Sequence, residues 1–325
     1  MSAPPPQDDL PEVSRERGYG GAGTSIARAV PRIDISDFHR RREEIGDALW
    51  EAATRSGFFQ LEGHGISSEL ISDAFEFSER FFALPEGEKA GLDLKPGTNA
   101  GWEFMSQVRP STGQADQKES YQITLPRMAH LWPELPGFKA VMLAFERANW
   151  AVGMKVLSAF ATRLGFAEDF FTEVHDPMQS TYQSTLRLLH YLPLTQTVDP
   201  DSIWRAGAHT DFDCLTLLHQ RPGQGGLQLC PGNESDSGAW TDVEPARDVI
   251  TCNIGDMLMR WSDDKLKSTL HRVRMPAAEG QRSSRYSIAF FCQANTDVII
   301  ETPEGGYEPI SAADYLYQRV TANAL

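Results

Sequence analysis

The spacing of apolar residues changes along the chain and predicts helices in the first half and strands in the second. Residues 45–53, 70–82 and 138–164 carry apolar side chains at the three- and four-residue spacing of amphipathic helices. From Ser184 to about Val298 the pattern shifts to short runs with a period of two, which is typical of β-strands. We therefore expect helices followed by a β-rich core.

Two short strands and a closing helix complete the expected secondary structure, at residues 30–35, 57–60 and 311–320. Ser311 suits the N-cap of the closing helix because its hydroxyl can accept a free backbone N–H. Gly165 follows the longest helical pattern and predicts its C-terminal end. Residues 91–117 are rich in Gly, Pro and polar residues, which predicts a loop or an irregular lid.

These patterns divide the chain into four regions. We expect a flexible tail, an N-terminal α/β region with the long helix, a β core, and a C-terminal helix and tail, over residues 1–28, 29–179, 180–298 and 299–325. The tail is expected because its prolines, glycines and scattered charges leave little to bury. The fold class is mainly β with flanking helices. Its core is expected to be a double-sheet jelly roll, the double-stranded β-helix of cupin-like proteins, which binds small ligands between its sheets.

Composition excludes several classes of protein. The 325 residues are 41% hydrophobic and 23% charged, which is ordinary for a globular chain. No apolar run approaches the roughly 20 residues of a membrane helix, and the N-terminus lacks the apolar core of a secretion signal, so we expect a cytoplasmic protein. A formal net charge of −15 argues against a nucleic-acid partner. Four isolated cysteines are expected to be reduced and buried: Cys214, Cys230, Cys252 and Cys292.

An ordered set of residues in the last third suggests a metal site. His209-Thr-Asp211 is followed by a strand-like run, and His271 comes after a predicted turn. Among 8 histidines and 45 acidic residues, a His-x-Asp or His-x-Glu arises about once by chance, so order and context carry the argument. Two histidines and one carboxylate can hold a divalent metal on one face and leave the opposite positions open, as expected of a non-haem Fe(II) oxygenase.

Arg285-Tyr-Ser287 follows the metal motif and predicts an anion site. Strand alternation places one set of side chains on the face of Arg285: Ser287, Ala289, Phe291 and Gln293. The intervening residues face the surrounding packing: Tyr286, Ile288, Phe290 and Cys292. An arginine buried among apolar neighbours requires an anion. A diacid cosubstrate would provide one, and a structural salt bridge to Asp or Glu is the alternative.

Longer motifs carry a resemblance to a known family. Four C-terminal segments resemble the Fe(II)- and 2-oxoglutarate-dependent oxygenases of the isopenicillin N synthase-like family: Gly225-Gly-Leu-Gln228, Asn253-Ile-Gly-Asp256, Met257-Leu-Met-Arg-Trp-Ser262 and Lys267-Ser-Thr-Leu-His-Arg-Val273. Three early segments resemble its N-terminal region: Val30-Pro-Arg-Ile-Asp-Ile35, Gly57-Phe-Phe-Gln60 and Gly63-His-Gly-Ile66. The resemblance covers nearly the whole chain from about Val30 onward.

The resemblance implies a ligand set and a reaction. His209, Asp211 and His271 would bind Fe(II), and the cosubstrate 2-oxoglutarate would bind through three further residues: Arg285, Ser287 and Tyr191. Leu189 stands where the family has an asparagine, which removes one polar contact to the cosubstrate. With O2 as the second cosubstrate, such an enzyme oxidises a small organic molecule by hydroxylation, desaturation or ring closure and releases succinate and CO2.

Strand direction or loop position makes seven residues candidates for lining the substrate pocket: Arg187, Phe291, Gln293, Tyr121, Phe104, Phe212 and Trp102. Aromatic residues suit a flat or polycyclic molecule, although core packing accounts for most of them equally well. For Arg187 a role at the surface or in an interface is a balanced alternative. Flavonoid oxidation, nucleobase oxidation and microbial specialised metabolism all fit, and the oligomeric state is not indicated.

Three other functions remain open at this point. An oxidase like isopenicillin N synthase would use O2 without 2-oxoglutarate, with Arg285 and Ser287 holding a substrate carboxylate. A binding or sensor protein would keep the fold without catalysis, which the intact set of metal ligands argues against. A zinc hydrolase would use the same ligand types, but the downstream arginine and the extended resemblance argue against it.

Overall fold

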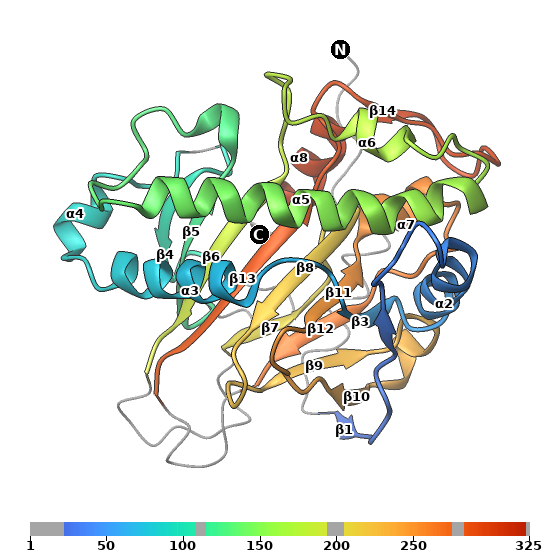
Figure 1. Ribbon diagram of the computed structural model, residues 1–325, viewed down its shortest axis with the longest axis horizontal. Coiled ribbons are helices and arrows are strands. Elements are labelled where there is room, and N and C mark those ends of the chain that lie inside the picture. Colours follow the sequence, from blue (N-terminus) through green and yellow to red (C-terminus); the bar gives the residue numbers. More distant parts are fainter. Residues whose placement is uncertain (1–22, 96, 108–114, 194–204, 275–282, 323–325) are drawn as a thin grey trace.

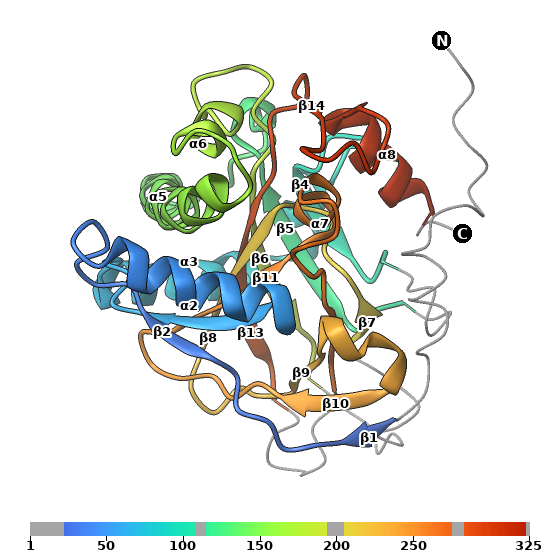
Figure 2. The ribbon, with the colours of Figure 1, turned by 90° about the vertical axis from the view of Figure 1, so that its right-hand side faces the viewer.

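The fold is described by a computed structural model for residues 23–95, 97–107, 115–193, 205–274 and 283–322. Two β-sheets face each other, and helices cover the outer face of the larger sheet (Figures 1 and 2). This is the layered, mainly β architecture expected of a jelly roll. A short two-stranded sheet near the C-terminus pairs β14 (Ile299–Ile300) with β15 (Ile310–Ser311).

The large sheet has eight strands in the order β2-β3-β11-β8-β13-β6-β5-β4. They span Arg32–Asp34, Phe58–Glu62, Ile250–Ile254, Leu215–Gln220, Arg285–Cys292, Thr185–Tyr191, Lys118–Ile123 and Gly101–Phe104. The small sheet has five strands in the order β1-β10-β9-β12-β7. They span Thr24–Ser25, Ala239–Asp242, Leu227–Cys230, Leu270–Val273 and Ala206–His209. Strands from the N-terminal part of the chain therefore extend the large sheet at both edges.

Helices surround the sheets. They are α2 (Arg42–Arg55), α3 (Ser68–Phe82), α4 (Glu86–Ala90), α5 (Phe138–Arg163), α6 (Phe170–Val174), α7 (Asp256–Trp261) and α8 (Ala312–Ala322), with 3-10 turns η2 (Leu125–Arg127) and η3 (Gly232–Ser237). The long helix α5 runs across the outer face of the large sheet (Figure 1). Gly153 allows this close approach, because a Cβ there would lie 2.5 Å from the Sγ of Cys292.

The two faces of β13 confirm the predicted alternation. Ile288, Phe290 and Cys292 are fully buried in the core between the large sheet and the helices. Ala289 and the half-buried Phe291 belong instead to a second cluster between the two sheets. The space between the sheets is thus lined by the residue set that includes Arg285.

The helices predicted from apolar spacing are present as α2, α3, α5 and α8. Gly165 follows α5 with φ of +85°, a backbone conformation that suits a residue without a Cβ. Ser311 caps α8 as predicted, since its Oγ accepts the backbone N–H of Asp314 at 3.0 Å.

Two predictions about irregular regions are corrected. The loop expected over residues 91–117 contains strand β4, which pairs with β5. The tail expected to reach residue 28 ends earlier, because Thr24 and Ser25 pair with β10 and Arg28 binds Glu234. Local composition did not reveal either pairing: the Gly- and Pro-rich stretch concealed β4, and β1 pairs with a strand more than 200 residues away. Residues 1–22 lie outside the described part of the chain.

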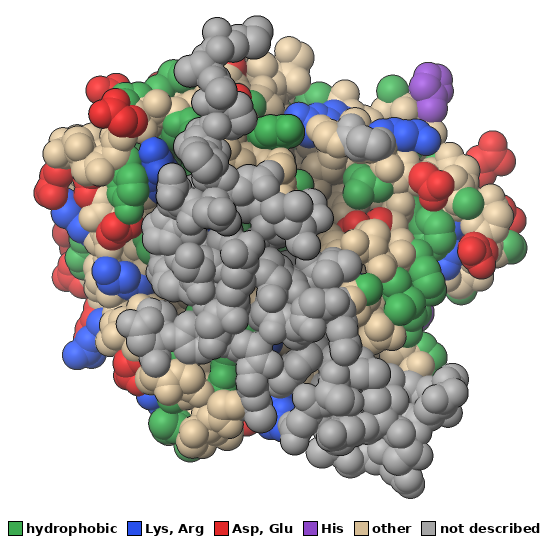
Figure 3. Space-filling view, turned by 180° about the vertical axis from the view of Figure 1, so that it is seen from behind, with side chains coloured by type: hydrophobic (Ala, Val, Ile, Leu, Met, Phe, Trp, Pro, Cys, Tyr) green, Lys and Arg blue, Asp and Glu red, His purple; other side chains and the backbone are tan. Residues whose placement is uncertain are grey.

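The surface charges and the burial of the cysteines match what the composition predicts for a globular chain. Acidic and basic side chains are interspersed over the described part of the face drawn in Figure 3. All four cysteines are buried, and no disulfide joins them in the described part of the chain. Among the described residues, no helix has the length and apolar character needed to cross a membrane.

Replacing Phe290 with alanine should lower the free energy of unfolding by about 3–5 kcal/mol, because the ring is fully buried and its removal leaves a cavity. Urea denaturation followed by circular dichroism measures this. A loss below about 1 kcal/mol would show that the helix-facing core can close around the gap.

Candidate metal centre and anion pocket

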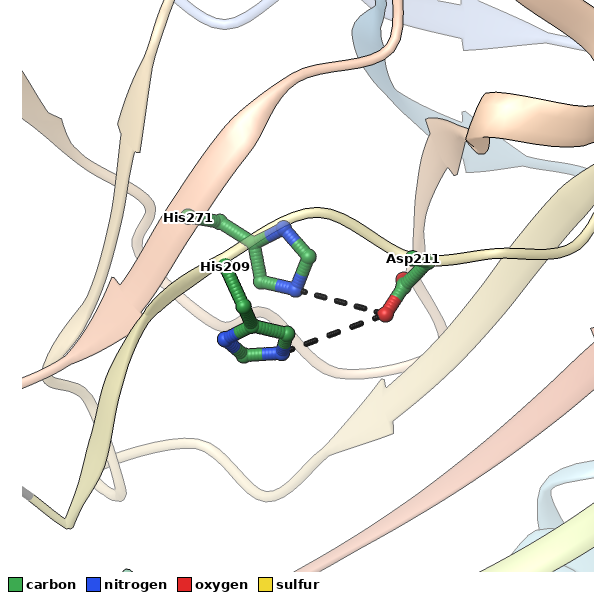
Figure 4. A group of neighbouring side chains, drawn as sticks. All are labelled: His209, Asp211 and His271. Atoms are coloured by element: carbon green, nitrogen blue, oxygen red, sulfur yellow. Dashed lines mark ion pairs between the residues drawn. The ribbon is translucent and has the colours of Figure 1, made fainter. Parts of the chain in front are cut away.

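Three predicted metal ligands meet between the sheets. His209 ends β7, Asp211 lies in the following turn, and His271 pairs with His209 across the neighbouring strand β12. The Nε2 atoms of the histidines lie 3.9 and 3.7 Å from Oδ1 of Asp211, and dashed lines join these atoms in Figure 4. The three side chains therefore turn their donor atoms toward one point.

Backbone contacts orient both imidazole rings. Nδ1 of His209 donates to the carbonyl of Gly207 at 2.7 Å, and Nδ1 of His271 donates to the carbonyl of Thr269 at 3.1 Å. Since a carbonyl oxygen only accepts, the proton of each neutral ring sits on Nδ1 and the lone pair on Nε2. Both histidines thus present the nitrogen that a metal ion requires.

The carboxylate of Asp211 is oriented by two neighbours in the large sheet. Its Oδ2 accepts the hydroxyl of Thr216 at 2.6 Å and the amide of Asn253 at 2.8 Å. These contacts leave Oδ1 directed toward the histidines. Asn253 comes from the Asn-Ile-Gly-Asp motif, so that motif supports a ligand as well as a turn.

A second carboxyl group, Asp213, lies behind the metal ligands. Burial raises the pKa of Asp213 well above its usual range, and the nearby charges of Asp211 and Asp256 raise it further. The hydroxyl of Thr216 acts in the opposite direction. Asp213 therefore lies close enough to share the Thr216 hydroxyl with Asp211. Sequence reasoning missed Asp213, which stands two residues after a predicted ligand.

The donor set fits a divalent transition metal. Ligand atoms of His209, Asp211 and His271 all lie within 4.8 Å of one another. All three residues are held by hydrogen bonds that do not use the facing donor atoms. Two imidazole nitrogens and one carboxylate oxygen on one side of an ion are the set typical of non-haem Fe(II).

Arg285, the candidate anion-binding residue, lies buried on the opposing sheet. It is 1% exposed and pairs with Tyr191 on β6, whose ring centre lies 4.6 Å from the guanidinium. Its Nε donates to the carbonyl of Gln224 at 3.0 Å, and Nη1 lies 3.5 Å from Oγ of Ser287. Burial lowers the pKa of Arg285, and Tyr191 opposes this shift.

No carboxylate of the described residues lies within 4.0 Å of Arg285, so the salt bridge considered as an alternative is not formed there. A guanidinium buried without an acidic partner favours a ligand anion. Leu189, in the position of the family asparagine, lies beside Ser287 and packs in the apolar cluster between the sheets. An apolar surface next to Arg285 and Ser287 suits the methylene groups of a short diacid.

Arg187 and Phe291 lie farther along the same inner face of the large sheet. Arg187 pairs with Ala289, and its guanidinium lies 4.9 Å from the centre of the Phe291 ring. Its Nη2 also donates to Oδ1 of Asn99 at 3.3 Å. Gln293 follows the strand, and its buried Oε1 has no hydrogen-bond partner among the described residues. The structure therefore brings Arg187 and Phe291 to one face of the sheet, and Gln293 lies just beyond the end of β13.

Comparisons with known proteins agree with this geometry. A family model described as the 2OG-Fe(II) oxygenase superfamily matches residues 182–294, and one described as the non-haem dioxygenase in morphine synthesis N-terminal matches residues 30–135. The proline hydroxylase buaE of Petromyces alliaceus is 32% identical, with 84% of this chain and 90% of that protein covered. The 2-oxoglutarate-Fe(II) type oxidoreductase hxnY of Emericella nidulans is 31% identical, with coverages of 83% and 80%.

A solved structure also matches. It is that of a full-length Neurospora crassa protein in complex with α-ketoglutarate and thymine, with a TM-score of 0.79 and 31% identity over 90% of this chain and 96% of that one. The chain belongs to the 2-oxoglutarate-Fe(II) oxygenase superfamily. It is a 2-oxoglutarate-dependent dioxygenase that uses Fe(II), 2-oxoglutarate and O2. The oxidase without 2-oxoglutarate, the inactive binding protein and the zinc hydrolase are correspondingly disfavoured.

Three candidates for lining the oxygenase's substrate pocket are corrected. Tyr121 is fully buried on the helix-facing side of β5, where its hydroxyl donates to the carbonyl of Leu131. Trp102 pairs with Tyr121 and donates to Glu119 at 2.8 Å on that same side. Phe104, two residues further along β4, is 50% exposed. The sequence did not reveal which parity of these strands faces inward.

Phe212 occupies a different place. Its half-buried ring lies next to Arg319 of α8, with 4.5 Å between the ring centre and the guanidinium. This contact directs Phe212 toward the C-terminal helix of the oxygenase.

The inward faces of β4 and β5 carry polar residues that sequence reasoning missed. Gln122 pairs with Arg187, and Glu103 accepts hydrogen bonds from Gln122 at 2.6 Å and Ser120 at 2.7 Å. Burial alone would raise the pKa of Glu103, but the Arg187 charge and the neighbouring hydroxyls lower it overall. Once the parity of β5 is known, its alternating sequence would have identified this set.

A second arginine also lies in this part of the oxygenase. Arg205, just before β7, is 4% exposed and donates to the carbonyl of Ser283 at 2.8 Å. Burial and the charge of Arg285 lower its pKa to about 10, against an opposing effect of Tyr191. The region around Tyr191 is therefore rich in positive charge. No motif marked Arg205 in the sequence.

Replacing Asn253 with alanine should weaken Fe(II) binding by about 10–100-fold, because Asp211 loses a donor that orients its carboxylate. An anaerobic Fe(II) titration of the metal-free enzyme measures this. Thr251→Ala is the matched control, since Thr251 faces the same way on β11 but contacts Gln60 and Gln220. Equal Fe(II) affinities in the two variants would contradict the orienting role.

Proposed function

We propose that His209, Asp211 and His271 hold Fe(II) in this dioxygenase. We also propose that Arg285 and Ser287, with Tyr191, bind the distal carboxylate of 2-oxoglutarate. The observation that carries the proposal is the buried Arg285 guanidinium, which has no acidic partner among the described residues and lies on the sheet that faces the metal ligands. The enzyme would then oxidise a small organic molecule bound between the same sheets.

Each residue has a defined task in this proposal. Iron and 2-oxoglutarate, when bound, supply the chemistry that activates O2 and releases succinate and CO2. His209 and His271 supply lone pairs because their Nδ1 protons are held by backbone carbonyls. Asp211 supplies one oxygen, and Thr216 and Asn253 hold the other. The surrounding apolar residues exclude water from the reacting groups.

The cosubstrate contacts must compensate for Leu189. The family asparagine would provide a polar contact that a leucine side chain lacks. The proposed cosubstrate residues still offer three polar groups: the guanidinium of Arg285, the hydroxyl of Ser287 and the hydroxyl of Tyr191. We propose that they bind the anion without the asparagine, and that Leu189 packs against its methylene groups.

The substrate wall favours a planar, polar molecule. A guanidinium next to the Phe291 ring offers donors beside an aromatic surface, and Asn99, Gln122 and Gln293 add amide groups nearby. Such a wall suits a flat molecule with carbonyl or other acceptor groups. The complex of the similar Neurospora crassa protein with thymine supports this class of substrate. We propose Arg187, Phe291 and Gln293 as substrate-binding residues.

We further propose that the enzyme acts in the cytoplasm, within specialised metabolism. Four buried cysteines that form no disulfide among the described residues support a reducing compartment. The description of the N-terminal family model refers to morphine synthesis, which supports a role in specialised metabolism. The net charge of −15 supports a small molecule as partner in preference to a nucleic acid.

Replacing His271 with alanine should abolish substrate-dependent succinate release, because one of the proposed Fe(II) ligands is lost. Panels of planar small molecules, assayed for succinate with Fe(II) and 2-oxoglutarate present, identify a substrate for the measurement. Oxidation of a substrate without succinate release would instead favour an oxidase that works without 2-oxoglutarate. Full activity of His271→Ala would refute the metal assignment.

Arg285→Gln should weaken 2-oxoglutarate binding by roughly 10–150-fold, since a hydrogen-bonded contact to a charged group contributes about 1.5–3 kcal/mol. Arg285→Lys should restore only part of the affinity, because an ammonium group lacks the planar fork. Anaerobic titration of the Fe(II)-loaded enzyme with 2-oxoglutarate measures both. Arg221→Gln, which breaks a partly exposed contact with Glu79, is the control and should keep the wild-type affinity.

Phe291→Ala should change the substrate range or the product ratio, because it removes the ring beside Arg187 and loosens the position of the substrate. Its effect on 2-oxoglutarate affinity should be much smaller than that of Arg285→Gln. Phe290→Ala is the matched control on the opposite face of β13, and it should reduce stability without changing products. The reverse result would place the substrate on the other face of the strand.

A further inference from the structure

The turn that carries Asp211 rests on the start of α7. The backbone N–H groups of Asp256 and Met257 donate to the carbonyls of Asp211 at 2.8 Å and Asp213 at 3.1 Å. Gly255 makes this approach feasible, because a Cβ there would lie 2.2 Å from the carbonyl oxygen of Asp213. The position of the metal-ligand turn therefore follows the position of the first residues of α7.

A closed group of side chains joins this turn to α8. Oδ2 of Asp256 accepts the hydroxyl of Thr210 at 2.9 Å and pairs with Nη2 of Arg319 at 2.7 Å. The same Nη2 atom donates to Oγ1 of Thr210 at 3.2 Å. Thr210 is the residue between the two proposed ligands His209 and Asp211. A residue of the C-terminal helix thus contacts the peptide segment that links two metal ligands.

Arg319 also contacts the other side of the ligand turn. Its guanidinium lies 4.5 Å from the ring centre of Phe212, the residue that follows Asp211. The side chains of Arg319 and Asp256 are both fully buried. Loss of the guanidinium would leave the Asp256 carboxylate buried without its counter-charge, next to the hydroxyl of Thr210. The turn would then lose its contacts to α8 on both sides of Asp211.

The helix α8 is held in place by contacts other than Arg319. Its start is fixed by the Ser311 cap and by backbone hydrogen bonds from Ala312 and Ala313 to residues 298 and 296. Arg260 of α7 donates to the carbonyl of Glu308, just before the helix. Figure 2 shows α8 beside α7. Removing the Arg319 guanidinium therefore leaves several anchors of the C-terminal segment.

We propose that Arg319 is a positioning residue for the metal centre. Through Thr210, Asp256 and Phe212 it fixes the turn so that Oδ1 of Asp211 faces His209 and His271. This inference rests on the proposed Fe(II) site. It makes the C-terminal helix a part of the metal-binding structure, although no residue of that helix is a proposed ligand.

Fe(II) alone is the probe that tests this. Metal-free full-length enzyme is titrated anaerobically with Fe(II) as wild type, Arg319→Gln, Arg319→Lys and Arg260→Gln. Arg319→Gln should weaken Fe(II) affinity roughly tenfold or more, as for other groups that orient metal ligands. Arg319→Lys should recover part of the loss. Arg260→Gln removes another contact of α7 with the C-terminal segment and should bind Fe(II) like wild type.

Co(II) substitution adds a readout that a loss of stability would not change. The visible absorption of the Co(II) enzyme depends on ligand geometry, and Arg319→Gln should alter it while Arg260→Gln should not. A wild-type Fe(II) affinity and Co(II) spectrum in Arg319→Gln would overturn the inference. Equal weakening in Arg260→Gln would also overturn it, because general loosening of the C-terminal segment would then explain the effect.

Two further variants keep the outcome decisive. If Arg319→Gln does not fold, Thr210→Val removes only the hydroxyl that Arg319 contacts, and it should weaken Fe(II) binding in the same direction. A wild-type affinity in Thr210→Val would overturn the inference. The proposed function has a separate check, since it fails if wild-type enzyme and His271→Ala bind Fe(II) equally. If His271→Ala loses Fe(II) binding but Arg319→Gln binds Fe(II) like wild type, the positioning role of Arg319 is rejected. The proposed Fe(II) site is then retained.

Discussion

Charged side chains buried between the two sheets must meet opposite charges or complementary hydrogen-bond partners there, because burial removes their hydration. Asp256 meets this requirement with Arg319, and Asp211 meets part of it with Thr216 and Asn253. Arg285 has no such partner among the described carboxylates. The proposed site offers two charged groups to ligands: Oδ1 of Asp211 and the guanidinium of Arg285. A metal ion would neutralise the first, and an organic dianion would neutralise the second.

The fold keeps these charges apart from the apolar core. The outer face of the large sheet packs against α2, α3 and α5, and its inner face carries Arg285, Ser287 and Arg187 beside a smaller apolar cluster. Phe290 and Arg285 lie on the same strand but on opposite faces. Alternate residues of β13 thus pack in the core or face the candidate site. Substitutions on the core face should mainly lower stability, and substitutions on the site face should mainly change ligand binding.

Support for the site extends well beyond the proposed ligands. Residues of the large sheet orient Asp211, backbone carbonyls of the small sheet orient the histidines, and α8 contacts the ligand turn. The proposed substrate-binding face adds Glu103, Ser120 and Gln122 from strands at the far edge of the large sheet. Segments from both halves of the chain therefore contribute to one space, in line with the family models that match residues 30–135 and 182–294.

The sequence by itself determined the features that depend on residue type and local period. The order of His209, Asp211, His271 and Arg285 indicated the chemistry, and a period of two assigned the faces of β13. Tertiary structure decided which parity of β4 and β5 faces inward, which moved Tyr121 and Trp102 into the core and brought Glu103 to the wall. It also brought Arg319 to Thr210, 109 residues away. Such contacts form between elements that pack only in the complete fold, so no local pattern encodes them.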